Sequence, residues 1–186
     1  MLAVWLVAAM LAGTSLAAPL DDAKAADKRG DYATALRLYQ PLANEGDSDA
    51  EFSLGRMYYN GQGVHHNNAE AVKWFHKAAN QGHALAQLYL GVMYAGGLGE
   101  PQDYAEAVKW YRKAADQGNG TAQNFLGLMY YTGQGVPQDY VQAHKWFNLS
   151  EEKISWAVRM RDQVESMMTP AQIAEAQKLA REWKPK

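Results

Sequence analysis

The chain of 186 residues contains no cysteine, and this absence excludes several kinds of chemistry. Without a thiol there is no disulfide, no cysteine nucleophile and no cysteine-ligated metal site. There is also no cysteine that could carry a lipid anchor. We therefore expect no redox chemistry at cysteine and no stable membrane insertion of the mature chain.

An excess of positive charge is missing as well. The chain has 18 Lys and Arg against 20 Asp and Glu, for a net charge of −2. Binding to a phosphate backbone needs a basic surface, so we expect no nucleic-acid partner. The 48% hydrophobic content is typical of a globular domain with a real core.

Charge is absent from the N-terminus, where no Asp, Glu, Lys or Arg precedes Asp21. Residues 2–11 are almost wholly apolar, and Ser15 and Ala17 are the small residues that a signal peptidase site requires. The apolar run is too short to span a bilayer. We expect residues 1–17 to be a signal peptide and the mature protein to be periplasmic or secreted. The lack of Lys or Arg before the apolar run leaves open a start upstream of Met1, and a buried N-terminal helix is the other alternative.

What the chain does have is an internal repeat of 36 residues. Four kinds of position recur at this interval: a glycine (Gly46, Gly82, Gly118), a Leu-Gly pair (Leu54-Gly55, Leu90-Gly91, Leu126-Gly127), a tyrosine (Tyr58, Tyr94, Tyr130) and a tryptophan (Trp74, Trp110, Trp146). A period of this length is typical of stacked units, each too small to bury its apolar face alone.

Each unit is predicted to contain two helices separated by glycine turns, with no strand alternation anywhere in the chain. We expect first helices over residues 48–60, 84–96 and 120–132, and second helices over 67–81, 103–117 and 139–152. A degenerate first unit over residues 20–39 turns at Gly30. Residues 18–152 would then form the solenoid, and residues 153–186 would close it as two capping helices. The second of these begins at Thr169, Pro170 and Gln172, a capping sequence.

Two sets of repeated residues have a structural interpretation. The second helix of each unit carries alanines and a tryptophan at the spacing of one apolar face, so Trp74, Trp110 and Trp146 are expected in the packing between helices. Gly55, Gly91 and Gly127 lie inside the first helices, where a glycine costs about 1 kcal/mol against alanine. We expect each of these glycines at a helix crossing with no room for a Cβ. The outer face, with Glu70 and Lys73, is expected to be solvated.

The pattern Ala-x-x-x-Leu-Gly-x-Met-Tyr, then Gly-x-Gly, then Ala-x-Ala-Val-Lys-Trp-x-x-Lys-Ala-Ala-x-Gln-Gly resembles the Sel-1-like repeat family over about residues 31–149. The resemblance implies an all-α, right-handed α-solenoid related to tetratricopeptide proteins, a role as adaptor or regulator, and no enzymatic activity. Some cysteine-rich members of the family carry a β-lactam-hydrolase label, but this chain has none of their cysteines.

Candidate chemistry is sparse. The five histidines include one adjacent pair, His65-His66, whereas a metal site needs three or four convergent ligands. Glu151 and Glu152 would point apart on a helix, so no catalytic pair is expected. We therefore expect no catalytic residues, no metal and no cofactor.

The predicted partner site comes from comparing the units. On a helical wheel, the positions of the first helix that are kept between units form one arc, and the positions that change form the other. The changing arc is rich in aromatic residues, as recognition surfaces are, and the family places it on the concave side. We call it the variable surface: Phe52, Arg56, Tyr59, Tyr89, Val92, Phe125, Leu128 and Tyr131. Three alternatives stay open: self-occupation of this surface by a terminal segment, a secreted β-lactam or cell-wall hydrolase, and a peptidoglycan or carbohydrate binder.

Overall fold

The structure, a computed structural model, describes residues 17–150 and 155–186. Within these ranges it consists of helices and turns, without a strand. The helices are α1 (Ala17–Lys28), α2 (Tyr32–Asn44), α3 (Ser48–Asn60), α4 (Asn68–Asn80), α5 (Ala84–Gly96), α6 (Tyr104–Asp116), α7 (Gly120–Thr132), α8 (Tyr140–Ser150), α9 (Ser155–Glu165) and α10 (Pro170–Glu182). Residues 1–16 of the predicted signal peptide lie outside the described residues. Glu151 and Glu152 lie outside them as well.

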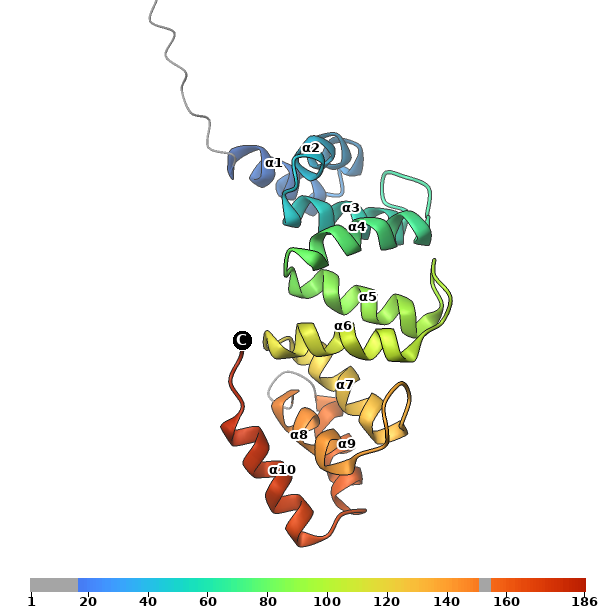
Figure 1. Cartoon of the computed structure of the whole chain (residues 1–186). Helices are drawn as coiled ribbons and strands as arrows, with labels where there is room; N and C mark the ends of the chain where they lie inside the picture. Colours follow the sequence, from blue (N-terminus) through green and yellow to red (C-terminus); the bar gives the residue numbers. More distant parts are fainter. Residues whose placement is uncertain (1–16, 151–154) are drawn as a thin grey trace, which may run out of the picture.

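The helices form antiparallel pairs that stack in chain order from α1–α2 to α7–α8 (Figure 1). Successive pairs begin 36 residues apart, at Ser48, Ala84 and Gly120, so the predicted period is confirmed. The predicted helices over 48–60, 84–96 and 120–132 coincide with α3, α5 and α7, which we call the A helices together with α1. The partners α2, α4, α6 and α8 are the B helices.

Side-chain caps and glycines set the helix ends. Asp47, His83 and Asn119 cap the beginnings of α3, α5 and α7, each accepting a hydrogen bond from the backbone N–H three residues on. The same helices end at glycines in the left-handed conformation, such as Gly97 with φ of 64°. The second glycine of each turn also packs closely: a Cβ on Gly99 would lie 2.6 Å from the carbonyl carbon of Asn68, at the beginning of α4.

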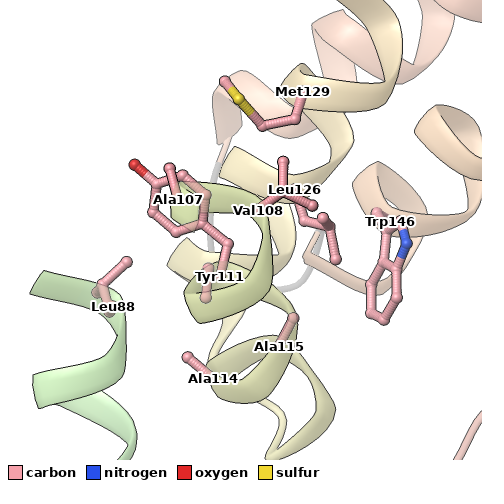
Figure 2. Close-up of a cluster of buried hydrophobic side chains, with 10 residues drawn as sticks. Leu88, Ala107, Val108, Tyr111, Ala114, Ala115, Leu126, Met129 and Trp146 are labelled. Carbon is pink, nitrogen blue, oxygen red and sulfur yellow. The ribbon is translucent and has the colours of Figure 1, made fainter. Parts of the chain in front are cut away.

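The core is a series of buried clusters along the stack, made of alanines, aromatic rings and aliphatic side chains. Figure 2 shows one part of it, where Tyr111 and the alanines of α6 pack between Leu88 of α5 and Leu126 of α7. Trp110 and Trp146 are buried as expected, whereas Trp74 is half-buried. Lysines lie over the faces of two of these indoles, with Lys77 Nζ 4.0 Å from the Trp74 ring centroid and Lys113 Nζ 4.0 Å from that of Trp110.

The outer face of the B helices is solvated, as expected. The exposed Lys73 lies 2.5 Å from Glu70, and Lys109 lies 2.7 Å from Glu106 one unit later. Exposed pairs of this kind contribute little to stability.

Two helices follow the last repeat and cover its end. α9 ends at Glu165, and α10 begins with the predicted capping box between Thr169 and Gln172. The C-terminal residues then return toward α6 (Figure 1), where the Lys186 N–H donates to the Asp116 carbonyl at 2.8 Å. The Trp183 ring meets Trp146 edge-on at 6.4 Å, so the tail is packed against the last repeats.

Candidate functional site

The eight residues of the variable surface are all half-buried, but they lie in two different environments. Phe52, Arg56 and Tyr89 line one cavity with a volume of about 720 Å³. Side chains of α1, α2, α3 and α5 form its walls, so it joins three successive units on the side of the A helices. Leu128 and Tyr131 instead pack near α9.

One wall of the cavity is aromatic. The Phe52 and Tyr89 rings meet edge-on with centroids 5.7 Å apart, and Tyr59 meets Tyr89 in the same way at 5.8 Å. Behind them, the buried Phe75 ring of α4 lies 5.0 Å from Tyr89 and supports it. Leu85 also lines the cavity and is 44% exposed, which makes it one of the two large apolar side chains most exposed in the described residues. This wall offers apolar surface held in place by the core.

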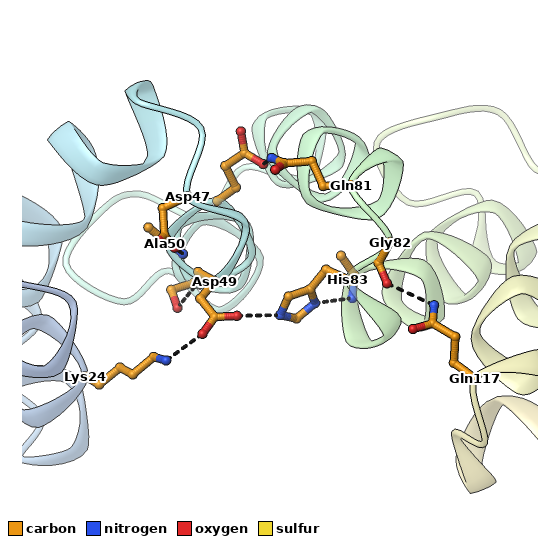
Figure 3. Close-up of polar contacts among 11 residues, drawn as sticks. Lys24, Asp47, Asp49, Ala50, Gln81, Gly82, His83 and Gln117 are labelled. Carbon is orange, nitrogen blue, oxygen red and sulfur yellow. Dashed lines mark hydrogen bonds and ion pairs between the residues drawn. The ribbon is translucent and has the colours of Figure 1, made fainter. Parts of the chain in front are cut away.

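The other wall carries charge, and Asp49 is at its centre. The Asp49 carboxylate accepts a hydrogen bond from Lys24 Nζ of α1 at 2.6 Å, and it lies 3.4 Å from His83 Nε2 at the beginning of α5 (Figure 3). The hydrogen bond from Lys24 lowers the pKa of Asp49 and raises the pKa of Lys24. Three consecutive units are therefore linked by one line of polar contacts.

His83 connects the two walls. Its Nδ1 accepts the Ala86 N–H at 3.2 Å and so caps α5, which leaves the proton of the neutral ring on Nε2, facing Asp49. Its ring also stacks on Phe52 with centroids 4.6 Å apart. Burial lowers the pKa of His83, which favours the neutral form that the cap requires.

A second ion pair also belongs to this charged wall. Arg56 of α3 donates to the Asp27 carboxylate of α1, and the Asp27 side chain is only 11% exposed. Arg56 occupies the position of Val92 in α5 and Leu128 in α7, so among these three A helices only α3 carries a charge there.

The other part of the variable surface is covered by the chain itself. Phe125 stacks on the buried Tyr111 with centroids 5.1 Å apart, and Leu128 packs against the cluster around Phe147 and Val164. The Tyr131 hydroxyl accepts a hydrogen bond from Gln163 Nε2 of α9 at 2.9 Å. α9 therefore contacts the C-terminal end of the variable surface.

The comparison of the repeat units did not predict five of the cavity-lining residues: Lys24, Asp27, Lys28, Asp49 and His83. The first three belong to α1, whose unit is too degenerate for a reliable alignment with the others. His83 did carry a signal: it stands 36 residues from Asp47 and from Asn119, where the other units have ordinary capping residues.

Within the described residues, no three His, Asp or Glu side chains lie close enough together to hold a metal ion. His76 lies 3.1 Å from the Tyr94 hydroxyl, and the buried His144 lies 3.2 Å from Glu165 of α9. His65 and His66 are exposed in the turn before α4. Each histidine thus has its own separate surroundings.

The repeat is matched by the profile of the Sel1 repeat over residues 23–47, 48–83, 84–119 and 120–153. The chain belongs to the Sel1 repeat family. The four matched units correspond to the four helix pairs α1–α2 to α7–α8, so the degenerate first unit is a genuine repeat. Proteins of this family are commonly interaction scaffolds and are typically not enzymes.

Solved structures show the same architecture. A Sel1 repeat protein from Oxalobacter formigenes is 27% identical, with a TM-score of 0.70 over 87% of this chain and 74% of that one. The c5321 protein of uropathogenic Escherichia coli, a protective antigen with an SLR fold, is 31% identical, with a TM-score of 0.61 over 81% of this chain. This chain spans only 40% of c5321. A Sel1 repeat protein from Klebsiella pneumoniae, 24% identical with a TM-score of 0.51 over 80% of this chain and 76% of its own, shares the fold.

A comparison with curated proteins gives no match. Among residues 17–150 and 155–186, no helix is both long and apolar enough to cross a membrane.

Proposed function

We propose that this chain is an exported adaptor or regulatory scaffold that binds a protein or peptide partner on the side of its A helices. One observation carries the proposal: a cavity of about 720 Å³ in which aromatic rings and ion pairs from three successive repeats meet. Its volume lies within the range of about 300–1,000 Å³ that is usual for small-ligand pockets. It therefore suits a short segment of a partner.

The composition of the cavity supports recognition of a peptide. Tyr and Arg are the residues that most often dominate binding energy at protein interfaces, and the cavity contains Tyr89 and Arg56 beside Phe52. Leu85 remains 44% exposed at the cavity, and burying the rest of its surface would be favourable by roughly 1 kcal/mol. A bound peptide would provide that burial.

Selection from a phage-displayed random peptide library tests the proposal. The bait is the purified mature protein, and the selected peptides are measured by fluorescence anisotropy against variants. Leu85→Ser should weaken binding by about tenfold, whereas Met167→Ser should leave it unchanged. Met167, 48% exposed after α9, is the matched control because it is the other highly exposed apolar side chain of the described residues. A library that yields no binding peptide would contradict the proposed function.

Export is the second part of the proposal. It is supported by the apolar run of residues 2–11 and the small residues before Ala18. Intact-mass analysis of material exported by a bacterial host should find Ala18 as the first residue. Exported protein that retains Met1 would contradict cleavage at this position.

A further inference from the structure

The cavity carries more positive than negative charge, although the whole chain has a net charge of −2. Its lining contains three permanent cations, Lys24, Lys28 and Arg56, against two carboxylates, Asp27 and Asp49. His83 also belongs to the charged wall. Its Nδ1 accepts a hydrogen bond, so the ring is neutral in this arrangement. The excess of one positive charge gives the cavity a preference for an anionic group.

The pairing within the cavity points the same way. Both carboxylates are already occupied, Asp49 by Lys24 and Asp27 by Arg56. Lys28 has no carboxylate partner within the described residues, so its ammonium group is free to meet a carboxylate from outside. A cationic ligand would instead have to compete with Lys24 for Asp49, or with Arg56 for the largely buried Asp27.

The charged wall is also accessible. The side chains of Lys24 and Asp49 are 47% and 45% exposed, so their ion pair is a solvated one that costs little to rearrange. His83 touches the aromatic ring of Phe52 on one side and faces Asp49 on the other. Through Asp49 and His83, the cationic Lys24 is therefore connected directly to the aromatic Phe52.

We propose that the cavity binds an acidic segment of the partner, in which an Asp or Glu side chain lies next to a bulky apolar residue. The carboxylate is held by Lys28 and Lys24, and the apolar side chain packs on Phe52, Tyr89 and Leu85. This inference rests on the proposed function, because it names the chemistry of the segment that the adaptor recognises.

The test uses the peptides selected from the random library on the full mature protein. Each is synthesised with blocked termini, so that its only carboxylates are side chains, and in a second form with every Asp and Glu changed to Asn and Gln. We expect the selected set to be enriched in Asp and Glu beside aromatic or aliphatic residues. The neutral forms should bind about fivefold more weakly, and raised salt should reduce that difference.

The protein variants are Lys28→Gln and Lys28→Glu, with Lys73→Gln as the matched control. Both lysines are exposed on helices, so neither change threatens the fold, which circular dichroism verifies. Lys28→Gln should weaken binding of the acidic peptides by about fivefold and Lys28→Glu by more, whereas Lys73→Gln should have no effect.

The outcomes separate the inference from the function on which it rests. Peptides that lose affinity with Leu85→Ser but show neither acidic enrichment nor sensitivity at Lys28 would overturn the inference and leave the adaptor function standing. Basic peptides, or neutral forms that bind as tightly as the acidic ones, would overturn it in the same way. A library that yields no binding peptide would contradict both the proposed function and this inference.

Discussion

The ring of Tyr111 lies where the side chain of Gly91 would begin. A Cβ on Gly91 would overlap the Cδ1 and Cε1 atoms of that ring, so the aromatic ring of α6 packs directly against the backbone of α5. The same relationship recurs between Gly55 and Phe75, where the Cβ would lie 2.5 Å from the ring. The internal glycines of the A helices are therefore packing residues, as the sequence predicted.

Gly91→Ala should destabilise the protein by at least about 2 kcal/mol, because the Tyr111 ring is buried and stacked on Phe125, so moving it would disturb the core. Chemical denaturation measures the loss. Gly96→Ala is the control in the same helix, since its Cβ would meet only the Leu98 side chain, at 3.2 Å. Equal stability of Gly91→Ala and the parent would contradict the packing account.

A second variant distinguishes the clash from an effect on helix propensity. In a Tyr111→Leu background the ring is gone, and alanine is favoured over glycine in a helix by about 1 kcal/mol. Gly91→Ala should then cost much less, or stabilise the protein. An undiminished cost in that background would show that the ring is not the cause.

The sequence predicted the solenoid because successive units place the same residue types at the same packing positions, 36 residues apart. Gly55, Gly91 and Gly127 stood out only through their common interval, and the interval also located the helix boundaries to within a residue or two. That each glycine faces an aromatic ring of the B helix, rather than helix backbone, could not be derived from spacing, since it depends on how two helices cross.

The candidate site was predicted only in part, because repetition reveals what units share and the cavity depends on what they do not. Phe52, Arg56 and Tyr89 were found as positions that vary. Lys24 and Asp27 lie in the degenerate first unit and line the cavity through their ion pairs with Asp49 and Arg56 of α3. The contact of α9 with Tyr131 lay beyond the repeat pattern altogether.

Glu51→Gln should stabilise the protein at neutral pH. Glu51 is 4% exposed and accepts a hydrogen bond from Gln81 at 2.7 Å, at the position where the next unit pairs Gln87 with Gln117. Burial raises the pKa of Glu51, so the folded state binds more protons than the unfolded state above the usual pKa of 4.5. Native stability therefore falls as the pH rises through this window.

Thermal melts across that pH range measure the effect. The Gln variant should lack this loss and gain about 1 kcal/mol at neutral pH, the order of cost of a poorly compensated buried group. Glu175→Gln, at an exposed position of α10, is the control and should change nothing. A Glu51→Gln variant less stable than the parent at neutral pH would contradict the burial argument.

His83 should make the protein less stable as the pH falls below its usual pKa of 6.5. Burial lowers the pKa of His83, so the unfolded state binds more protons in this window, and folding is weakened as the pH drops through it. Protonation also turns Nδ1 into a donor facing the Ala86 N–H. The nearby charges, Asp49 and Lys24, act in opposite directions on His83.

His83→Asn should flatten this pH dependence and keep the cap, because Asn119 caps α7 in the same way. His83→Ala should lose the cap at a cost of about 1 kcal/mol at neutral pH. Denaturation curves at several pH values distinguish the two variants. A pH profile that is the same for the parent and His83→Asn would show that His83 does not titrate as argued.

Site-specific photo-crosslinking tests the central claim, that the partner binds on the side of the A helices. A photoreactive phenylalanine analogue is placed at Leu85 in the cavity, or at Lys109 on the exposed face of α6, and each protein is irradiated with a selected peptide bound. We predict a covalent peptide adduct from position 85 and none from position 109. An adduct from position 109 with none from position 85 would place the binding surface on the B helices and contradict the account.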